Sequence, residues 1–135
     1  MKIVPYLYFN GNCEEAFNFY HNILGGELSE IMRYKDQSSQ ELPSELGERI
    51  LHAELAIGDI LLYFSDTPDK EMYNPGDNIQ LNLNLDSLEE INKVYKAFEI
   101  GANITMPLQD TFWNAVYGTL IDKFGVSWSF NYMKG

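Results

Sequence analysis

The order of the predicted elements repeats at an offset of 75 residues, and this repeat restricts the fold more than any single motif. The offset places Asn12 on Ser87, Glu15 on Glu90, Ala16 on Ile91, Tyr20 on Tyr95 and Gly26 on Gly101. Each set begins with the spacing of a helix capping box and continues with an apolar stripe. Chance similarity between two amphipathic helices is an alternative explanation, since the identity between the halves is low. The matched order of helix and strands favours a duplication.

Each half predicts one helix and four strands in the order β-α-β-β-β. In the first half we expect strands at 3–9 and 27–34, two strands around the Gly58-Asp59 turn, and a helix from Asn12 to Gly25. In the second half we expect strands at 78–85, 103–107, 115–121 and 127–132, and a helix that starts at Ser87. Residues 36–48 are polar and predict a loop. Pro5 predicts that the first strand lies at a sheet edge.

The composition restricts the size of the fold and its partners. The chain has 135 residues and 45% hydrophobic content, which suits one domain with a sizeable core. Within this domain we place module one at about 1–66, a linker at 67–77 and module two at about 78–135. Twenty acidic and nine basic residues give a net charge of −11. This charge repels nucleic acid and anionic lipid, so we expect neither nucleic acid nor a membrane as a partner, and it attracts small cations.

The cysteine content and the N-terminal segment predict the compartment. Cys13 has no second cysteine to pair with, which fits a reducing environment. The first twelve residues carry one charged side chain and no long apolar run, so they fit neither a signal peptide nor a membrane span. We therefore expect a cytoplasmic protein.

Two segments carry a resemblance to a known family. The opening PYLYFNGNCEEAFNFYHNILGGEL and the closing LIDKFGVSWSFNY resemble the vicinal oxygen chelate superfamily, which includes glyoxalases, bleomycin-resistance proteins and extradiol dioxygenases. The segments FNGNCEEAFNFY, ILHAEL and DTFWNAVYG are similar to its PhnB-like branch. The resemblance covers almost the whole chain. It implies an α+β fold of two βαβββ modules that form a curved mixed sheet round a cavity, with the helices on the outer face, and a homodimer.

Alternation along the strands assigns residues to the implied cavity. His52 and Glu54 lie opposite the apolar side chains of their strand, and Pro5, Leu7 and Phe9 are placed on the cavity face of the first strand. Such a cavity suits a small organic molecule, for which His52 and Glu54 are the candidate proton-transfer pair. The candidate ligand-binding residues are Gln80, Asn82, Trp113, Tyr117 and Ser129, with Trp113 stacking at the mouth.

Each candidate residue also has a simpler structural interpretation. His52 can be a half-exposed strand histidine that bonds Glu54, and the amide side chains can form the solvent face of an antiparallel sheet. Trp113 can cover a sheet edge. The resemblance alone makes the polar face of the sheet concave.

Three function classes follow from these residues. A metal-free binding protein or enzyme of the PhnB-like kind would use His52 and Glu54. A drug-sequestering protein in the bleomycin-resistance manner needs no catalytic residue, and the net charge of −11 favours a cationic drug. Members of this branch are also labelled demethylubiquinone methyltransferases. We discount that label, because no Gly-rich loop joins a strand to a helix here as a nucleotide-like methyl donor requires.

The resemblance also implies where a metal would bind. Metal-dependent members of the superfamily place one His, Gln or Glu on each of four strands. The corresponding positions are Pro5, Tyr63 or Leu62, Gln80 and Ser129, and the offset of 75 pairs Pro5 with Gln80. Only Gln80 could coordinate a divalent ion, so we expect no metal and no cofactor. A metal-dependent lyase, isomerase or dioxygenase is the alternative if the assignment of these positions is wrong.

The first strand also bears on assembly. A monomer would expose a sheet edge and the apolar strip of Pro5, Leu7 and Phe9, and exposed strips of this kind mark interfaces. This pattern agrees with the homodimer that the resemblance implies.

Overall fold

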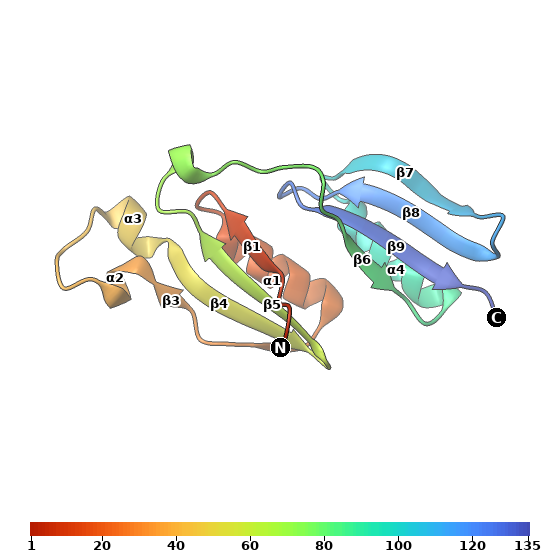
Figure 1. Cartoon of the computed structure of the whole chain (residues 1–135), viewed down its shortest axis with the longest axis horizontal. Coiled ribbons are helices and arrows are strands. Elements are labelled where there is room, and N and C mark those ends of the chain that lie inside the picture. Colours follow the sequence, from red (N-terminus) through yellow and green to blue (C-terminus); the bar gives the residue numbers. More distant parts are fainter. The chain divides into compact units, whose positions relative to one another are not determined.

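The computed structural model describes residues 1–135 as two compact units, Met1–Asn74 and Pro75–Gly135. Unit one contains β1 (Tyr6–Phe9), α1 (Cys13–Leu24), β2 (Glu27–Leu28), β3 (Met32–Arg33), α2 (Tyr34–Gln37), α3 (Ser44–Glu48), β4 (Ile50–Ile57), β5 (Ile60–Asp66) and a 3-10 turn (Lys70–Met72). Unit two contains β6 (Leu81–Asn84), α4 (Leu88–Glu99), β7 (Asn103–Asp110), β8 (Ala115–Ile121) and β9 (Ser127–Met133) (Figure 1). None of these helices has the length and hydropathy needed to cross a bilayer.

The two units share one sheet topology. The strand order is β1-β5-β4-β2 in unit one, where β3 also pairs with β4, and β6-β9-β8-β7 in unit two. The first strand of each unit runs parallel to the last, and the other neighbours are antiparallel. In each unit one long helix lies across one face of the sheet (Figure 1). The α+β class, the repeated order and the edge position of β1 are confirmed, except that the strand expected at 27–34 is split into β2 and β3.

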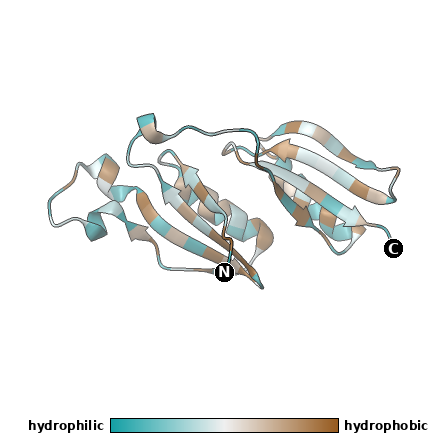
Figure 2. Cartoon of the chain, in the orientation of Figure 1, coloured by the Kyte–Doolittle hydropathy of each residue, from teal (hydrophilic) through white to brown (hydrophobic).

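The core of each unit is an aromatic cluster between the helix and the sheet. In unit one, the ring of Phe64 lies 5.2 Å from that of Phe17 and 6.2 Å from that of Phe9. In unit two, the ring of Phe98 lies 5.0 Å from that of Trp128. Hydrophobic and hydrophilic positions alternate as bands along the strands (Figure 2), because successive side chains of a strand point to opposite faces.

The repeat at 75 residues holds for the positions of the helices and strands, but not for which side chains of the first strand are buried. The offset carries the bounds of β1 onto β6 and those of α1 onto α4. However, Phe9 is buried whereas Asn84, its equivalent, is exposed, and Tyr8 is exposed where Leu83 is half-buried. Because strands alternate with a period of two, a slip of one residue exchanges the two faces. The pairing of Pro5 with Gln80 as equivalent site positions is therefore wrong.

The assignment of Pro5, Leu7 and Phe9 to the cavity face is also wrong. Phe9 is 1% exposed and packs against Phe64 on the face that α1 covers. Leu7 shares the parity of Phe9 and is half-buried. The strip is therefore part of the core of unit one and is not an exposed interface.

The segment predicted as a loop, residues 36–48, contains the short helix α3 and the last two residues of α2. The side chain of Asp36 accepts a hydrogen bond from the backbone N–H of Arg33 at 2.8 Å and so caps α2. The Arg33 guanidinium donates to the carbonyl of Glu48 at 2.7 Å, and the Lys35 ammonium donates to the Glu48 carboxylate at 2.6 Å. These contacts tie the two helices together, and a composition rule for loops does not detect them.

Only one of the two expected capping boxes forms a cap. The Ser87 hydroxyl accepts from the backbone N–H of Glu90 at 3.0 Å, while the Glu90 carboxylate accepts from the backbone N–H of Asp86. Asn12 makes no side-chain cap bond, so that part of the prediction is wrong. The buried carboxylate of Asp66 accepts from the backbone N–H of Cys13 instead.

This difference predicts unequal effects of two equivalent substitutions. We expect Ser87→Ala to lower the free energy of unfolding by about 1 kcal/mol, because it removes a capping acceptor. We expect Asn12→Ala to change it by less than about 0.5 kcal/mol, since no cap bond is lost. Urea unfolding of both variants beside the wild type measures the difference. Equal losses would contradict the assignment of the caps.

Candidate functional site

In unit one, the sheet face turned away from α1 carries a cluster of rings and one carboxylate. It consists of Tyr6 and Tyr8 from β1, Tyr63 from β5, and His52 and Glu54 from β4, and we call it the tyrosine–histidine face. The strand register brings these side chains together, because Tyr63 pairs with Tyr6 on one side and with Glu54 on the other.

A hydrogen-bond chain crosses this face. The Tyr6 hydroxyl lies 2.6 Å from Nδ1 of His52, and Nε2 of His52 lies 2.8 Å from Oε2 of Glu54. An ionised carboxylate can only accept, so Nε2 carries the hydrogen. In the neutral ring Nδ1 is then the acceptor, and the Tyr6 hydroxyl donates to it. His52 and Glu54 are thus joined by a hydrogen bond, and Tyr6 extends the chain, whereas a proton-transfer role of the pair stays a prediction.

Ring contacts hold the chain in place. Tyr6 stacks on Tyr8 with centroids 4.8 Å apart and an interplanar angle of 18°. Tyr63 meets His52 edge-on at 4.9 Å and Tyr6 at 5.3 Å. Tyr8 is nevertheless 52% exposed and Tyr6 is 39% exposed. The face therefore presents an accessible aromatic surface around a fixed hydroxyl.

Two pKa shifts restrict the chemistry of unit one. Burial, and next the neighbouring Tyr8, raise the pKa of Tyr6, so its hydroxyl keeps its proton at neutral pH. Burial, and next the carboxylate of Asp66, raise the pKa of the Cys13 thiol far above its ordinary value. Cys13 is therefore an unreactive core thiol, whereas Tyr6 is available as a hydrogen-bonding group.

In unit two, the face turned away from α4 is lined by amides and hydroxyls. The Ser129 hydroxyl donates to Oδ1 of Asn82 at 2.8 Å, and Nδ2 of Asn82 donates to Oδ1 of Asn84 at 2.8 Å. Nε2 of Gln80 donates to the Ser127 hydroxyl at 3.3 Å. Three of the predicted binding residues, Gln80, Asn82 and Ser129, thus share one polar face of this unit.

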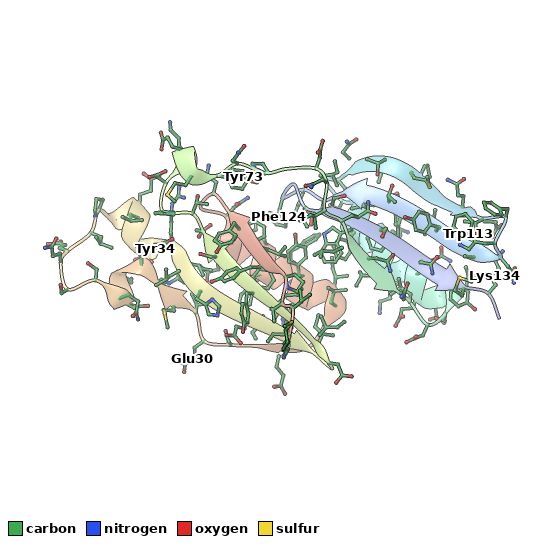
Figure 3. All side chains as sticks on the ribbon, viewed as in Figure 1. Glu30, Tyr34, Tyr73, Trp113, Phe124 and Lys134 are labelled. Atoms are coloured by element: carbon green, nitrogen blue, oxygen red, sulfur yellow. The ribbon has the colours of Figure 1, made fainter.

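The aromatic part of the predicted site lies at one end of unit two. Trp113 is in the turn between β7 and β8, and its ring centroid is 6.1 Å from that of Tyr117. Figure 3 shows Trp113 and Lys134 near each other at this end, where the backbone N–H of Lys134 donates to the carbonyl of Asn114. A role of Trp113 and Tyr117 in ligand binding stays a prediction.

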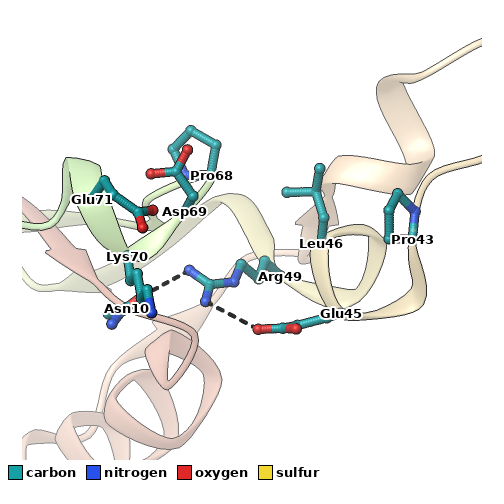
Figure 4. A pocket seen from close by; sticks show the side chains of 9 residues that line it. All are labelled: Asn10, Pro43, Glu45, Leu46, Arg49, Pro68, Asp69, Lys70 and Glu71. Carbon is teal, nitrogen blue, oxygen red and sulfur yellow. Dashed lines mark hydrogen bonds and ion pairs between the residues drawn. The ribbon is translucent and has the colours of Figure 1, made fainter.

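A separate hollow of about 610 Å³ lies in unit one around Arg49 (Figure 4). Its lining residues are Asn10, Pro43, Glu45, Leu46, Arg49, Pro68, Asp69, Lys70 and Glu71. The Arg49 side chain is 11% exposed, and its Nη1 donates to Oδ1 of Asn10 at 3.1 Å and to the carbonyl of Thr67 at 2.9 Å. Arg49 thus already holds two loops together, which makes this hollow a weaker candidate than the tyrosine–histidine face.

Sequence reasoning missed Tyr6 and Tyr8 as site residues. The segment YLYF contains four large side chains, so hydropathy alone does not say which alternate pair is buried. Tyrosine is the better candidate for the open face, because its hydroxyl requires a partner or water. The hydroxyls of Tyr6 and Tyr8, which Leu7 and Phe9 lack, were therefore the sequence signal that could have placed the two tyrosines on the open face.

The residues of the structure do not fit a metal. No group of three or more His, Cys, Asp or Glu side chains is placed to hold an ion. Of the positions implied by the family resemblance, Pro5 and Leu62 have no side-chain donor atom. Tyr63 is a neutral phenol packed edge-on against His52 and Tyr6, and Gln80 and Ser129 bond other side chains of their own sheet face. A metal-free site stays a prediction.

Three known proteins resemble the chain over nearly their whole lengths. Protein PA1353 from Pseudomonas aeruginosa is 37% identical, with a TM-score of 0.86 over 100% of this chain and 99% of that one. A putative 3-demethylubiquinone-9 3-methyltransferase, PhnB protein, from Bacillus cereus is 26% identical, with a TM-score of 0.83 over 98% and 99%. Protein YjdN from Escherichia coli (strain K12) is 31% identical over 145 residues, which cover 99% of this chain and 97% of YjdN.

Similarity of fold extends further than similarity of sequence. A glyoxalase/bleomycin resistance protein/dioxygenase family enzyme from Burkholderia phytofirmans PsJN is 16% identical, with a TM-score of 0.65 over 96% of this chain and 97% of that one, which shows a shared fold alone. A family model described as 3-demethylubiquinone-9 3-methyltransferase matches residues 1–130. The chain therefore belongs to this PhnB-like family, which has the glyoxalase/bleomycin-resistance fold.

Proposed function

We propose that this protein binds a small organic molecule on the tyrosine–histidine face and that the Tyr6–His52–Glu54 chain moves a proton at that site. The observation that carries the proposal is the continuous hydrogen bonding from an exposed hydroxyl through an imidazole to a carboxylate. A purely structural histidine needs no such path to the surface. An imidazole next to a carboxylate is a common general base.

The chain supports one balanced proton transfer. Tyr6 takes a proton from the bound molecule and passes its own proton to Nδ1 of His52. His52 then carries a positive charge, which the Glu54 carboxylate at 2.8 Å from Nε2 stabilises. The molecule is left as the conjugate base, and return of the proton to a different atom of that base restores the neutral ring and completes a proton shift.

The other histidine of the chain provides a matched control for this proposal. We expect freshly purified protein to release a bound metabolite on denaturation, which mass spectrometry identifies, and to transform it on incubation. His52→Ala should abolish the transformation, because it removes the proton acceptor, whereas His21→Ala should leave it unchanged. His21 lies on α1, where Nε2 contacts the carbonyl of Gly26 at 3.2 Å. A His52→Ala protein that transforms the metabolite at the wild-type rate would overturn the proposal.

Sequestration without chemistry is the second candidate function. The net charge of −11 attracts cationic molecules at long range, and an open aromatic face binds them without any reaction. In this case, the released compound is recovered unchanged from the wild type. The relative from Bacillus cereus is named a putative methyltransferase. Methyl transfer is not part of our proposal, because Gly11 is the one glycine between β1 and α1 and its N–H is bonded to Asp66.

A homodimer in the cytoplasm completes the proposal. The cytoplasmic location is supported by the lone Cys13. The dimer is supported by exposed apolar side chains near the β7–β8 turn and the C-terminus, where Phe112 is 97% exposed and Met133 and Trp113 are also exposed. We expect light scattering to give twice the chain mass of 15.6 kDa, and Phe112→Ser to shift the mass toward one chain. A single-chain mass for the wild type at micromolar concentration would contradict the dimer.

A further inference from the structure

We infer that the ligand of the tyrosine–histidine face is a planar aromatic ammonium compound whose N–H donates to the Tyr6 oxygen. This inference rests on the proposed function and specifies its ligand class. It follows from the direction of the hydrogen bonds, the surrounding rings and the charge of the protein.

The hydrogen bonds of the chain all point toward Glu54. Nε2–H of His52 donates to the Glu54 carboxylate, and the Tyr6 hydroxyl donates to Nδ1 of His52. The single hydroxyl hydrogen of Tyr6 is thus already used, and its oxygen offers only lone pairs to a ligand. Hydrogen bonds in such a chain polarise one another. Because the Tyr6 hydroxyl donates into the chain, its oxygen becomes a stronger acceptor for a ligand. The Tyr6 oxygen can therefore accept a hydrogen bond from a ligand N–H. It cannot donate one to the carboxylate or carbonyl oxygen of a ligand, because its only hydrogen is already used.

The rings and the net charge favour a positive, flat ligand. The stacked pair of Tyr6 and Tyr8 presents aromatic surface on β1, and Tyr63 adds a ring on β5. The faces of tyrosine rings attract cations, most strongly where water is excluded. The charge of −11 adds a long-range attraction for cations, and none of the five residues of this face is a lysine or an arginine.

Protonation of His52 would reverse the chain. A positively charged imidazole donates from both nitrogens, so Nδ1–H would donate to the Tyr6 oxygen and the Tyr6 hydrogen would turn to the ligand. The titratable groups that contact His52 are Tyr6 on β1, Tyr63 on β5 and Glu54 on its own strand, and Tyr8 stacks on the far side of Tyr6. On β3, His52 pairs with Met32, which does not titrate. The preference for a donor ligand should therefore weaken in acid.

Three probes with the same ring separate donor, charge and aromatic contributions. The probes are benzylammonium, trimethylbenzylammonium, which has the charge but no N–H, and benzoate. Binding is followed by the NMR shifts of the His52 ring, with the His21 ring as an internal reference. At about pH 7.5 benzylammonium should bind about five- to tenfold more tightly than the trimethyl compound, the worth of one hydrogen bond. Benzoate should bind most weakly.

One substitution and one change of pH complete the test. Tyr6→Phe keeps the ring and should bring benzylammonium to the affinity of the trimethyl compound. Lowering the pH until the NMR shifts of the His52 ring report its protonation should narrow the gap in affinity between the two cations in the wild type but not in Tyr6→Phe. If benzoate binds as tightly as benzylammonium, or if Tyr6→Phe leaves the gap unchanged, the ligand class is wrong. Absence of binding by all three probes also refutes it, whereas the proposed function stands or falls on the co-purified metabolite.

Discussion

Asp66→Ala should lower the free energy of unfolding by about 4 kcal/mol, which is among the largest effects expected of any single substitution in unit one. The carboxylate is 1% exposed and accepts three backbone hydrogen bonds. Oδ1 accepts from the N–H groups of Gly11 at 2.7 Å and Cys13 at 3.1 Å, and Oδ2 accepts from the N–H of Ile50 at 2.9 Å. Alanine leaves these donors without their acceptor, at the point where β5, α1 and β4 meet. Thermal and urea unfolding measure the loss.

Two further variants separate this explanation from a general sensitivity to mutation. Asp66→Asn keeps an oxygen at Oδ1 and replaces Oδ2 by an N–H donor. Its loss of stability should therefore be smaller than that of Asp66→Ala, and the difference between the two losses should be about 1–2 kcal/mol. Asp77→Ala removes an exposed carboxylate and should change stability by less than about 0.5 kcal/mol. Equal stability of Asp66→Ala and Asp77→Ala would refute the role of Asp66.

Trp128→Ala should cost unit two about 4 kcal/mol, the usual effect of removing a large buried ring. Trp128 is buried on β9, its ring lies 5.0 Å from that of Phe98, and its Nε1 donates to Oδ2 of Asp122 at 2.9 Å. Trp128→Phe retains most of the ring but leaves Oδ2 of Asp122 without this donor, so we expect a smaller loss of about 2 kcal/mol. The measurement is calorimetric unfolding of each variant.

The second tryptophan is the control for this series. Trp113 is 44% exposed, and Trp113→Phe should change stability by less than about 0.5 kcal/mol. The emission of the Trp113→Phe protein then reports Trp128 alone and should shift to the red when the protein unfolds. A Trp128→Ala protein that unfolds at the wild-type temperature would contradict the placement of Trp128 in the core.

The two long helices, α1 and α4, and the β4–β5 hairpin could be predicted from the sequence, because their signals are local. Ser87 and an apolar stripe at helical spacing mark α4, and Gly58-Asp59 marks the hairpin turn. The cap of α1 could not be predicted in this way. Its acceptor is Asp66, which lies 53 residues after Cys13 in the chain, whereas Asn12 stands at the expected position and makes no cap bond.

The candidate site was predictable in part for a related reason. Alternation along β4 places His52 and Glu54 two residues apart on one face, and the structure joins them. The same rule failed on β1, because the four residues of YLYF are all large and partly apolar, so their pattern does not distinguish the faces. Burial of Phe9 against Phe64 decides the matter, and this tertiary contact also turns Tyr6 toward His52.

The reversed faces of β1 and β6 mean that the two halves are not interchangeable, although β1 matches β6 and α1 matches α4 in length. A gene in which LNLN replaced YLYF would place an asparagine at the position of Phe9, under α1, and leucines where Tyr6 and Tyr8 now meet solvent. Averaging the two halves into a consensus repeat would create the same conflict. An ancestral symmetric protein would therefore have needed a shift of one residue in one of its first strands before the aromatic and amide faces could diverge.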